Sequence, residues 1–218
     1  MKVELYDKPY QFPYLVVDDY YDKEELIKIW HELGYFKDKL VSPKEGGSAY
    51  RTDNKGKREY LKTNTCLYID QAIEHSLIKE CNRKTFDLMN DIKDQQKNHS
   101  TSTWFFKNLT TNYDSTLISY YENNAYYKSH FDQALVTVLT WLYVNPKKFK
   151  GGDLTFTDYD ITIECINNRT IMFPSIIKHE VSSIIMKEED CNKGLGRWCL
   201  TQFGTNRDRR TPDPSDSN

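Results

Sequence analysis

The sequence predicts an α+β fold, in which a β-sandwich or barrel carries helices on one side. Two observations lead to this prediction. The first half of the chain contains two segments with the apolar spacing of a helix, and the second half is a succession of short apolar runs, many with period-two alternation. Runs of helices followed by runs of strands are typical of α+β domains. A length of 218 residues suits one domain with a core of its own.

The composition excludes several classes of protein. The chain has 30 Lys and Arg against 32 Asp and Glu, a formal net charge of −2, which argues against binding to nucleic acid through bulk charge. Its five cysteines are scattered, and none forms a C-x-x-C pair, which fits a reducing compartment. No apolar stretch reaches the length of a membrane span. We therefore expect a cytoplasmic protein without membrane contacts, and we do not expect nucleic acid as a partner.

The chain is expected to open with a strand at residues 13–17 and a helix at 22–34. Apolar residues at helical spacing would lie on one face of this helix: Leu26, Ile29, Trp30 and Leu33. Asp22 followed by Glu25 resembles a capping box, with Asp in place of Ser or Thr. Gly34 is expected to end the helix, because glycine favours the backbone conformation just past a helix end.

Residues 41–63 contain glycines and many charges but no sustained apolar pattern, with six basic and three acidic residues. They predict a long, mobile loop with a strand near 48–52. A loop of this length is either functional or a solvated connection, and the sequence does not decide between the two. A strand at 65–69 and a second long helix at about 71–96 are expected to follow.

The second half predicts the strands of the sheet region, separated by Asn, Gly and Pro. The predicted strands are 117–121, 135–144, 154–157, 161–165, 170–173, 179–184 and 198–203. Residues 205–218 contain no apolar residue and should be disordered. We therefore expect one domain over residues 1–204 and a tail over 205–218.

The candidate chemistry lies in this strand-rich half. His130 and Asp132 form an H-x-D pair, and on extended chain residues i and i+2 point to the same face. His179 follows 47 residues after Asp132, beside a predicted strand. Two imidazoles and one carboxylate on one side of a metal form the facial triad of non-haem Fe(II) oxygenases. An H-x-D pair alone is a weak signal, so the interpretation depends on its neighbours.

Arg197 opens an apolar strand in which Cys199, Thr201 and Phe203 share its face. A buried arginine needs an anionic partner. A dicarboxylate whose far end contacts Arg197 and Thr201 would supply one, through a charge-assisted contact. A structural pair between Arg197 and a carboxylate of the protein itself is the competing interpretation.

The stretch from Tyr120 to Phe203 resembles the Fe(II)/2-oxoglutarate dioxygenases of the prolyl 4-hydroxylase branch. The resemblance rests on five elements in the order and spacing of that family: Ser119-Tyr120-Tyr121-x5-Tyr127-x2-His130-x-Asp132, the strand LTWLYVN at 139–145, Gly151-Gly152-Asp153-Leu154-x-Phe156, Phe173-Pro174-Ser175-x3-His179-Glu180-Val181, and Gly196-Arg197-x3-Thr201-x-Phe203. It implies a double-stranded β-helix (jelly-roll, cupin-like) core with supporting N-terminal helices. Phe203 stands where the family often has Trp, and residues 186–196 form an insertion.

The resemblance also implies roles for individual residues. His130, Asp132 and His179 would be the metal ligands and Arg197 the anchor for the far carboxylate of 2-oxoglutarate. Thr201 and Tyr121 occupy positions that often add hydrogen bonds to this cosubstrate. The implied cofactors are Fe(II), 2-oxoglutarate and O₂, with ascorbate considered as a reductant. Family members that halogenate have a small residue at the position of Asp132, so Asp132 favours hydroxylation.

The sequence leaves several functions open. The first hypothesis is a hydroxylase of prolyl residues in a protein or peptide, which releases succinate and CO₂. The second is a hydroxylase of a free amino acid or small metabolite. A third, of a different class, is a non-catalytic jelly-roll binding module that holds a metal. A nucleic-acid demethylase of the same superfamily is not favoured, because that branch usually has a second Arg after the last motif strand, where this chain has Gly204.

Overall fold

A computed structural model describes residues 1–8, 11–46, 49–52, 54–95 and 104–207 of the chain. Its largest feature is an antiparallel seven-stranded sheet, here called the major sheet. In spatial order its strands are β1 (Lys2–Tyr6), β2 (Tyr14–Asp18), β12 (Arg169–Pro174), β8 (Val136–Leu142), β15 (Arg197–Thr205), β6 (Tyr113–Tyr121) and β5 (Thr65–Tyr68). The predicted disordered tail falls mostly outside the described residues, although its first residue, Thr205, belongs to β15.

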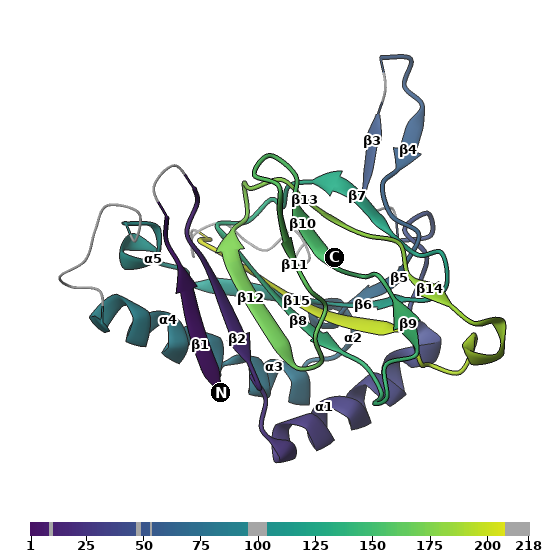
Figure 1. Cartoon of the computed structure of the whole chain (residues 1–218), viewed down its shortest axis with the longest axis horizontal. Helices are drawn as coiled ribbons and strands as arrows, with labels where there is room; N and C mark the ends of the chain where they lie inside the picture. The colour runs from purple at the N-terminus through teal and green to yellow at the C-terminus, as the bar shows by residue number, and fades with distance from the viewer. Residues whose placement is uncertain (9–10, 47–48, 53, 96–103, 208–218) are drawn as a thin grey trace.

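A second, four-stranded minor sheet faces the major sheet. Its order is β11 (Ile161–Ile163), β10 (Leu154–Phe156), β13 (His179–Val181) and β7 (Tyr127–His130). From β6 to β15 the chain passes back and forth between the two sheets, which gives the double-stranded β-helix that the sequence resemblance implied. The α+β class is thus confirmed, with the helices α1, α3 and α4 along the lower side of the molecule in Figure 1.

Two further strand pairs lie outside these sheets. The pair β9 (Phe149–Lys150) and β14 (Ile185–Met186) precedes the insertion, which contains a short 3-10 helix at Glu188–Asp190. The pair β3 (Tyr50–Thr52) and β4 (Arg58–Tyr60) forms a hairpin that projects from the body of the molecule (Figure 1). This hairpin occupies the middle of the region that was expected to be mostly loop.

The helices are α1 (Lys23–Phe36), α2 (Ile69–Ala72), α3 (Leu77–Asn82), α4 (Lys84–Gln95) and α5 (Trp104–Asn108), with a 3-10 turn at Lys37–Lys39 after α1. The capping box of α1 is confirmed, because the Asp22 side chain accepts from the Glu25 amide while the Glu25 side chain accepts from the Asp22 amide. The expected end at Gly34 was wrong. The helix continues because Phe36 is fully buried in the core, and that burial outweighs the weak preference of one glycine.

The single long helix expected at 71–96 was also wrong. The chain instead forms α2, α3 and α4, with an extended residue at Ile73 after α2. Ser76 caps α3 by accepting from the Lys79 amide at 3.2 Å, and the Ser76 hydroxyl donates to Glu32 of α1 at 2.8 Å. These local polar contacts interrupt a segment whose apolar spacing alone is continuous.

The major sheet separates two apolar cores. One lies between the sheet and the helices and contains Trp198 and Leu200 of β15. The other lies between the two sheets and contains Trp141 of β8 and Cys199 of β15. The alternation along β15 therefore sends every second side chain toward the minor sheet, and the candidate site residues Arg197 and Thr201 belong to that set.

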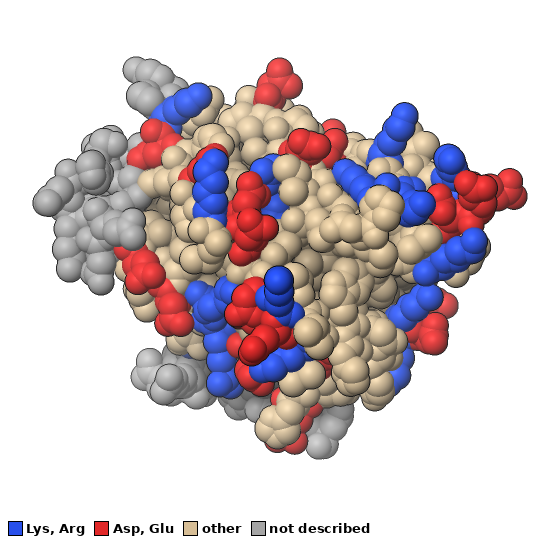
Figure 2. Space-filling model, turned by 60° about the horizontal axis from the view of Figure 1, so that its bottom comes forward, with Lys and Arg blue, Asp and Glu red and all other residues tan. Residues whose placement is uncertain are grey.

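The surface of the helical side carries mixed charge. In Figure 2, which brings the lower edge of Figure 1 forward, blue and red side chains are interspersed on this face. Ion pairs between helices account for part of this pattern, with Lys28 and Glu80 at 3.2 Å and Lys84 and Glu25 at 2.5 Å. None of the described helices is long and apolar enough to cross a lipid bilayer.

Candidate active site

A cavity of about 480 Å³ lies between the two sheets. The major sheet forms one wall through alternate residues of β5, β6, β8 and β15, and the minor sheet forms the other through β7 and β13. It collects every residue that the sequence singled out: Tyr121, His130, Asp132, His179, Arg197 and Thr201. Residues separated by up to 80 positions in the sequence therefore meet in one cavity.

His130, Asp132 and His179 come together at one end of the cavity. His130 ends β7 and His179 begins β13, and the two residues are paired across the minor sheet. The Nε2 atoms of His130 and His179 lie 3.6 and 3.5 Å from the Asp132 carboxylate oxygens. One ligand atom from each residue lies within 4.8 Å of the other two, so a single ion can contact all three.

Backbone contacts orient both imidazoles for this task. His130 Nδ1 lies 2.8 Å from the Lys128 carbonyl oxygen, and His179 Nδ1 lies 2.9 Å from that of Ile177. A carbonyl oxygen can only accept, so Nδ1 of each ring is the protonated nitrogen. The lone pair of each ring is therefore on Nε2, which faces Asp132. Such outer hydrogen bonds fix the tautomer and raise the basicity of a metal ligand.

Asp132 is held by a short polar network from the major sheet. Its Oδ2 accepts from the Thr137 hydroxyl at 2.7 Å, and its backbone amide donates to the Ser175 carbonyl at 3.0 Å. Thr137 is in turn 2.8 Å from the Ser175 hydroxyl. The carboxylate is thereby fixed in position by residues that are themselves fully buried.

The electrostatics of the triad suit a cation. Burial, together with the nearby His179, lowers the pKa of His130 to about 3, so its imidazole is neutral and free to coordinate. Burial raises the pKa of Asp132, despite the opposing effects of His179 and the Thr137 hydrogen bond. A buried carboxylate is disfavoured without a positive partner, and a divalent ion between the three residues would supply one.

Arg197 lies in the interior of the same cavity with no exposed surface. All three of its guanidinium nitrogens are buried without a hydrogen-bond partner. Its guanidinium carbon lies 4.7 Å from the ring of Tyr121 and 5.3 Å from that of Trp141. No carboxylate of the described residues pairs with it, so the structure lacks the internal ion pair of the competing interpretation. The guanidinium instead presents unused donors to whatever occupies the cavity.

The glycine pair 151–152 makes room for this arginine. Both residues have a positive φ, 74° and 78°. A Cβ atom on Gly152 would lie 2.7 Å from Arg197 Cδ and 2.6 Å from Ile184 Cδ1. Glycine is therefore required at position 152 for two reasons: its backbone has a positive φ, and Arg197 approaches it too closely for a Cβ atom.

Tyr121 and Thr201 complete the wall around the guanidinium. Tyr121 on β6 is paired with Arg197 on β15, and Thr201 lies further along β15 on the same side. Burial raises the pKa of Tyr121, so its hydroxyl is neutral and can donate. Phe203 lines the cavity beyond Thr201, 6.4 Å from the ring of Tyr68.

Two lining residues were not assigned a role from the sequence. The ring of Tyr127 stacks on that of His130, with centroids 3.5 Å apart and planes 11° apart. Lys62 is 4 % exposed and lies beside Tyr127 at the cavity wall. Tyr127 belongs to the quoted motif, but Lys62 is one of six basic residues in a charged segment, and composition does not distinguish it.

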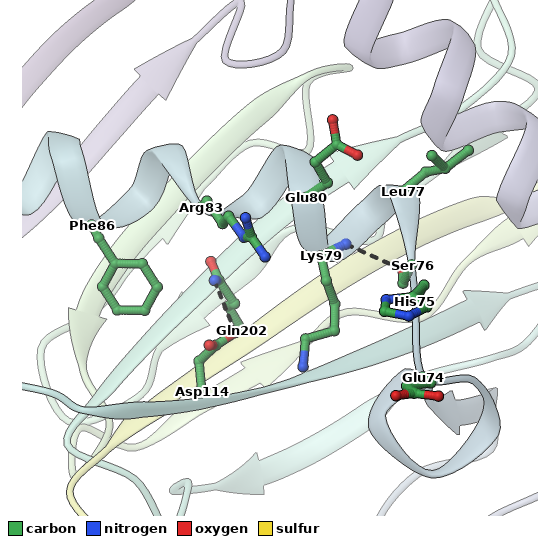
Figure 3. Close-up of a pocket in the computed structure, with 10 residues that line it drawn as sticks. All are labelled: Glu74, His75, Ser76, Leu77, Lys79, Glu80, Arg83, Phe86, Asp114 and Gln202. Carbon is green, nitrogen blue, oxygen red and sulfur yellow. Dashed lines mark hydrogen bonds between the residues drawn. The ribbon is translucent and has the colours of Figure 1, made fainter.

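A second cavity of about 490 Å³ lies on the helical side of the major sheet (Figure 3). Its lining comes from the end of the α2–α3 loop, from α3 and α4, and from Asp114 of β6 and Gln202 of β15. Gln202 Nε2 donates to Asp114 at 3.2 Å within it. None of the residues with candidate chemistry lines this cavity.

Comparison with known sequences finds one family model that is similar to part of the chain. Residues 116–204, which carry the whole triad and Arg197, match the family model described as the 2OG-Fe(II) oxygenase superfamily. The match covers 89 of the 218 residues of the chain, and over this part the chain is similar to that superfamily. This similarity supports a 2-oxoglutarate-dependent dioxygenase over a non-catalytic binding module. No curated protein is significantly similar to the oxygenase in sequence.

Solved structures share its fold. A prolyl 4-hydroxylase from Pseudomonas putida has a TM-score of 0.60 and 14% identity over 89% of this chain and 93% of its own. A Trichoplax adhaerens prolyl hydroxylase in complex with a hypoxia inducible factor peptide has a TM-score of 0.55 and 12% identity, over 88% and 83%. OsALKBH1 has a TM-score of 0.54 and 13% identity, over 90% and 100%. The fold of the oxygenase is thus that of prolyl hydroxylases and their relatives.

The residues present fit the cofactors that this superfamily uses. The donor set of two imidazoles and one carboxylate suits Fe(II). The guanidinium of Arg197 suits one carboxylate of 2-oxoglutarate, since it is buried and has no hydrogen-bond partner among the described residues. The cavity volume of about 480 Å³ is in the usual range for sites that hold a small molecule.

Proposed function

We propose that this oxygenase hydroxylates prolyl residues in a protein or peptide. In this proposal His130, Asp132 and His179 hold Fe(II), and Arg197 holds the far carboxylate of 2-oxoglutarate. The observation that carries the choice of a peptide is the β3–β4 hairpin. It projects from the body of the molecule (Figure 1), and its Tyr50 lines the cavity.

Each residue has a defined task in this proposal. When bound, iron and 2-oxoglutarate supply the oxidation: O₂ and the cosubstrate give succinate and CO₂, and one oxygen atom enters a C–H bond of the substrate. Arg197, with Tyr121 and Thr201, orients the cosubstrate and neutralises its far charge. The protein does not need a proton donor at the reacting carbon, so its contribution is position and the exclusion of water. Ascorbate would keep the metal reduced.

The hairpin is attached close to the metal ligands. Lys128 of β7, two residues before His130, pairs with Glu59 of β4 at 2.8 Å. The backbone amide of Lys128 also donates to the Leu61 carbonyl at 2.8 Å. These contacts fix the position of the hairpin relative to β7. A peptide bound to the hairpin would therefore lie at a fixed position relative to the metal ligands.

Aromatic side chains line the entrance. Tyr50 of the hairpin and Phe131, between the two metal ligands of the H-x-D pair, both line the cavity and are exposed. The guanidinium carbon of Arg58 lies 4.4 Å from the centroid of the Tyr50 ring. Aromatic grooves are a common recognition surface for proline, whose rigid ring loses little entropy on binding. These two rings favour a proline over a polar target residue.

The test is a succinate-release assay with two panels, one of proline-containing peptides and one of free amino acids and small metabolites. We expect peptides to stimulate turnover. Deletion of residues 53–57, which join β3 to β4, should raise the peptide KM and leave the slow substrate-free decay of 2-oxoglutarate nearly intact. Stimulation by free proline alone, with no response to any peptide, would contradict the proposal.

The cavity itself favours the second candidate, a hydroxylase of a free amino acid or small metabolite. Its volume of about 480 Å³ can hold a small substrate besides the cosubstrate. Under this alternative the deletion of 53–57 would open the metal site to water and impair both reactions alike. The two candidates are therefore separated by the same variant.

A further inference from the structure

Lys62 is a buried cation that none of the roles above uses. It lies between β4 and β5, and an antiparallel bridge pairs it with Tyr127 of β7. Only 4 % of its surface is exposed, and it lines the same cavity as the triad and Arg197. It therefore closes the side of the cavity where the edge strand of the major sheet meets the minor sheet.

The ammonium group of Lys62 has only weak partners in the protein. Its Nζ lies 3.4 Å from the thiol sulfur of Cys66 and 5.3 Å from the ring centroid of Tyr127. Among the described residues no carboxylate lies within 4.0 Å of it. The partly buried lysines Lys79 and Lys84, by contrast, each pair with a carboxylate. An ammonium group that is removed from water without an anionic partner is costly, and such a cost is tolerated where a ligand brings the partner.

The charges of the loaded cavity do not balance without a further anion. Lys62 and Arg197 each contribute a positive charge, and Asp132 contributes a negative charge. Both imidazoles are neutral when they act as ligands through Nε2. Fe(II) and 2-oxoglutarate, at +2 and −2, cancel. One positive charge is therefore left over, and Arg197 is already assigned to the cosubstrate.

We propose that Lys62 binds a carboxylate of the substrate, next to the carbon that is hydroxylated. This inference rests on the proposed function, and for a peptide it specifies an acidic residue beside the target proline. A free amino acid would offer the same chemistry through its own carboxylate. The ammonium also packs against Tyr127, whose ring stacks on His130, so a carboxylate held here would lie near the metal end of the cavity.

The test measures binding without turnover. The protein is loaded with Mn(II) and 2-oxoglutarate without oxygen, and affinities are measured by calorimetry for acetyl-glutamyl-prolinamide, acetyl-glutaminyl-prolinamide and free proline. The first two differ only in one carboxylate. We expect the glutamyl compound to bind about 10- to 100-fold more tightly than the glutaminyl compound, as for hydrogen bonds to charged groups. Tighter binding of free proline than of both peptides would identify the free amino acid as the source of the carboxylate.

Variants of Lys62 then assign the preference to this residue. Lys62→Met should remove the preference while leaving the affinity for 2-oxoglutarate within twofold of wild type. Lys62→Arg should retain part of it, because the charge is kept. Lys150→Met, which removes an exposed cation of β9, is the matched control and should leave the preference unchanged. Circular dichroism would verify that each variant is folded. If Lys62→Met does not fold, Lys62→Arg still tests the inference.

Three outcomes would overturn the inference. The first is equal binding of the glutamyl and glutaminyl compounds by the wild-type protein. The second is a preference for the glutamyl compound that survives in Lys62→Met. The third is a Lys62→Met protein whose only change is weaker binding of 2-oxoglutarate, which would make Lys62 a cosubstrate ligand. Failure of the proposed function looks different: the carboxylate preference would depend on Lys62, but no prolyl compound would be hydroxylated when iron and oxygen are supplied.

Discussion

The two cavities on opposite faces of the major sheet are almost equal in volume, about 480 and 490 Å³, yet they differ in how their charges are satisfied. On the helical side Asp114 accepts from Gln202, and Lys79 pairs with Asp70. Between the sheets, within the part of the chain that the structure describes, Arg197 has no hydrogen-bond acceptor and Lys62 contacts only a thiol and a ring. The comparison teaches that size does not identify a site in this protein. Unpaired buried charge identifies the site, because a bound ligand of opposite charge would compensate the cost of burying it.

The largest effect is expected from removing one of the proposed metal ligands. His130→Ala should lower metal affinity by more than about 100-fold, since even the outer hydrogen bonds of metal ligands are worth 10- to 100-fold. Turnover of 2-oxoglutarate should be lost with the metal. Metal content by mass spectrometry and succinate release would measure both. His75→Ala, which removes an exposed histidine of the helical-side cavity, is the control and should change neither. A His130→Ala protein that still turned over 2-oxoglutarate with iron would exclude this triad.

The next effect concerns the unpaired guanidinium. Arg197→Ala should weaken 2-oxoglutarate binding by about 2–5 kcal/mol, because the buried carboxylate of the cosubstrate would lose its charged partner. Arg197→Lys should recover part of the affinity, since the charge is retained but the planar fork is not. Calorimetry with the Mn(II)-loaded protein would measure both constants. Arg83→Ala, on the helical side, should have no effect. Unchanged affinity in Arg197→Ala would place the anchor elsewhere.

The smallest effect is expected at the helical-side cavity, where the charge of Lys79 is paired with that of Asp70. Burial lowers the pKa of Lys79, but the hydrogen bond and charge of Asp70 outweigh it, so its pKa in the folded protein is above the usual value of 10.5. The pair therefore stabilises the fold below pH about 10.5, and its contribution disappears as the pH rises through the folded pKa.

Lys79→Met should therefore lower the free energy of unfolding at pH 7 by at most about 1 kcal/mol, because the pair is partly exposed. The affinity for 2-oxoglutarate should not change. Denaturant unfolding of both proteins at pH 7 and above pH 10.5 would show the difference shrinking at high pH. An equal difference at both pH values would mean that packing of the side chain, and not its charge, is responsible.

The elements predicted best were those whose signal is local and repeated. The period-two runs of the second half predicted the strands β6, β8, β10, β11, β12, β13 and β15, because alternation directly reflects a sheet with two different faces. The capping box at Asp22 was predicted because it depends on residues three positions apart. In both cases the stabilising contact lies within the segment that shows the pattern.

The errors share a different cause. Residues 71–96 have a continuous apolar spacing, but contacts of Ser76 with α1 and α3 divide the segment. The helix α1 continues past Gly34 because a core distant in sequence buries Phe36. The strand β1, at residues 2–6, was not predicted at all. It forms because it pairs with β2, and its short polar sequence gives no sign of that pairing. In all three cases the structure of a segment depends on contacts with residues outside that segment.

The candidate site divides in the same way. The sequence by itself determined the types, order and spacing of His130, Asp132, His179 and Arg197, since metal and carboxylate binding require particular side chains and these are visible in the residues. Only the tertiary structure decided that they enclose one cavity, that Arg197 lacks a protein acceptor, and that Lys62 is buried beside them. Whether a buried charge is paired depends on which segments, distant in sequence, fold against it. Local sequence patterns do not show which segments those are.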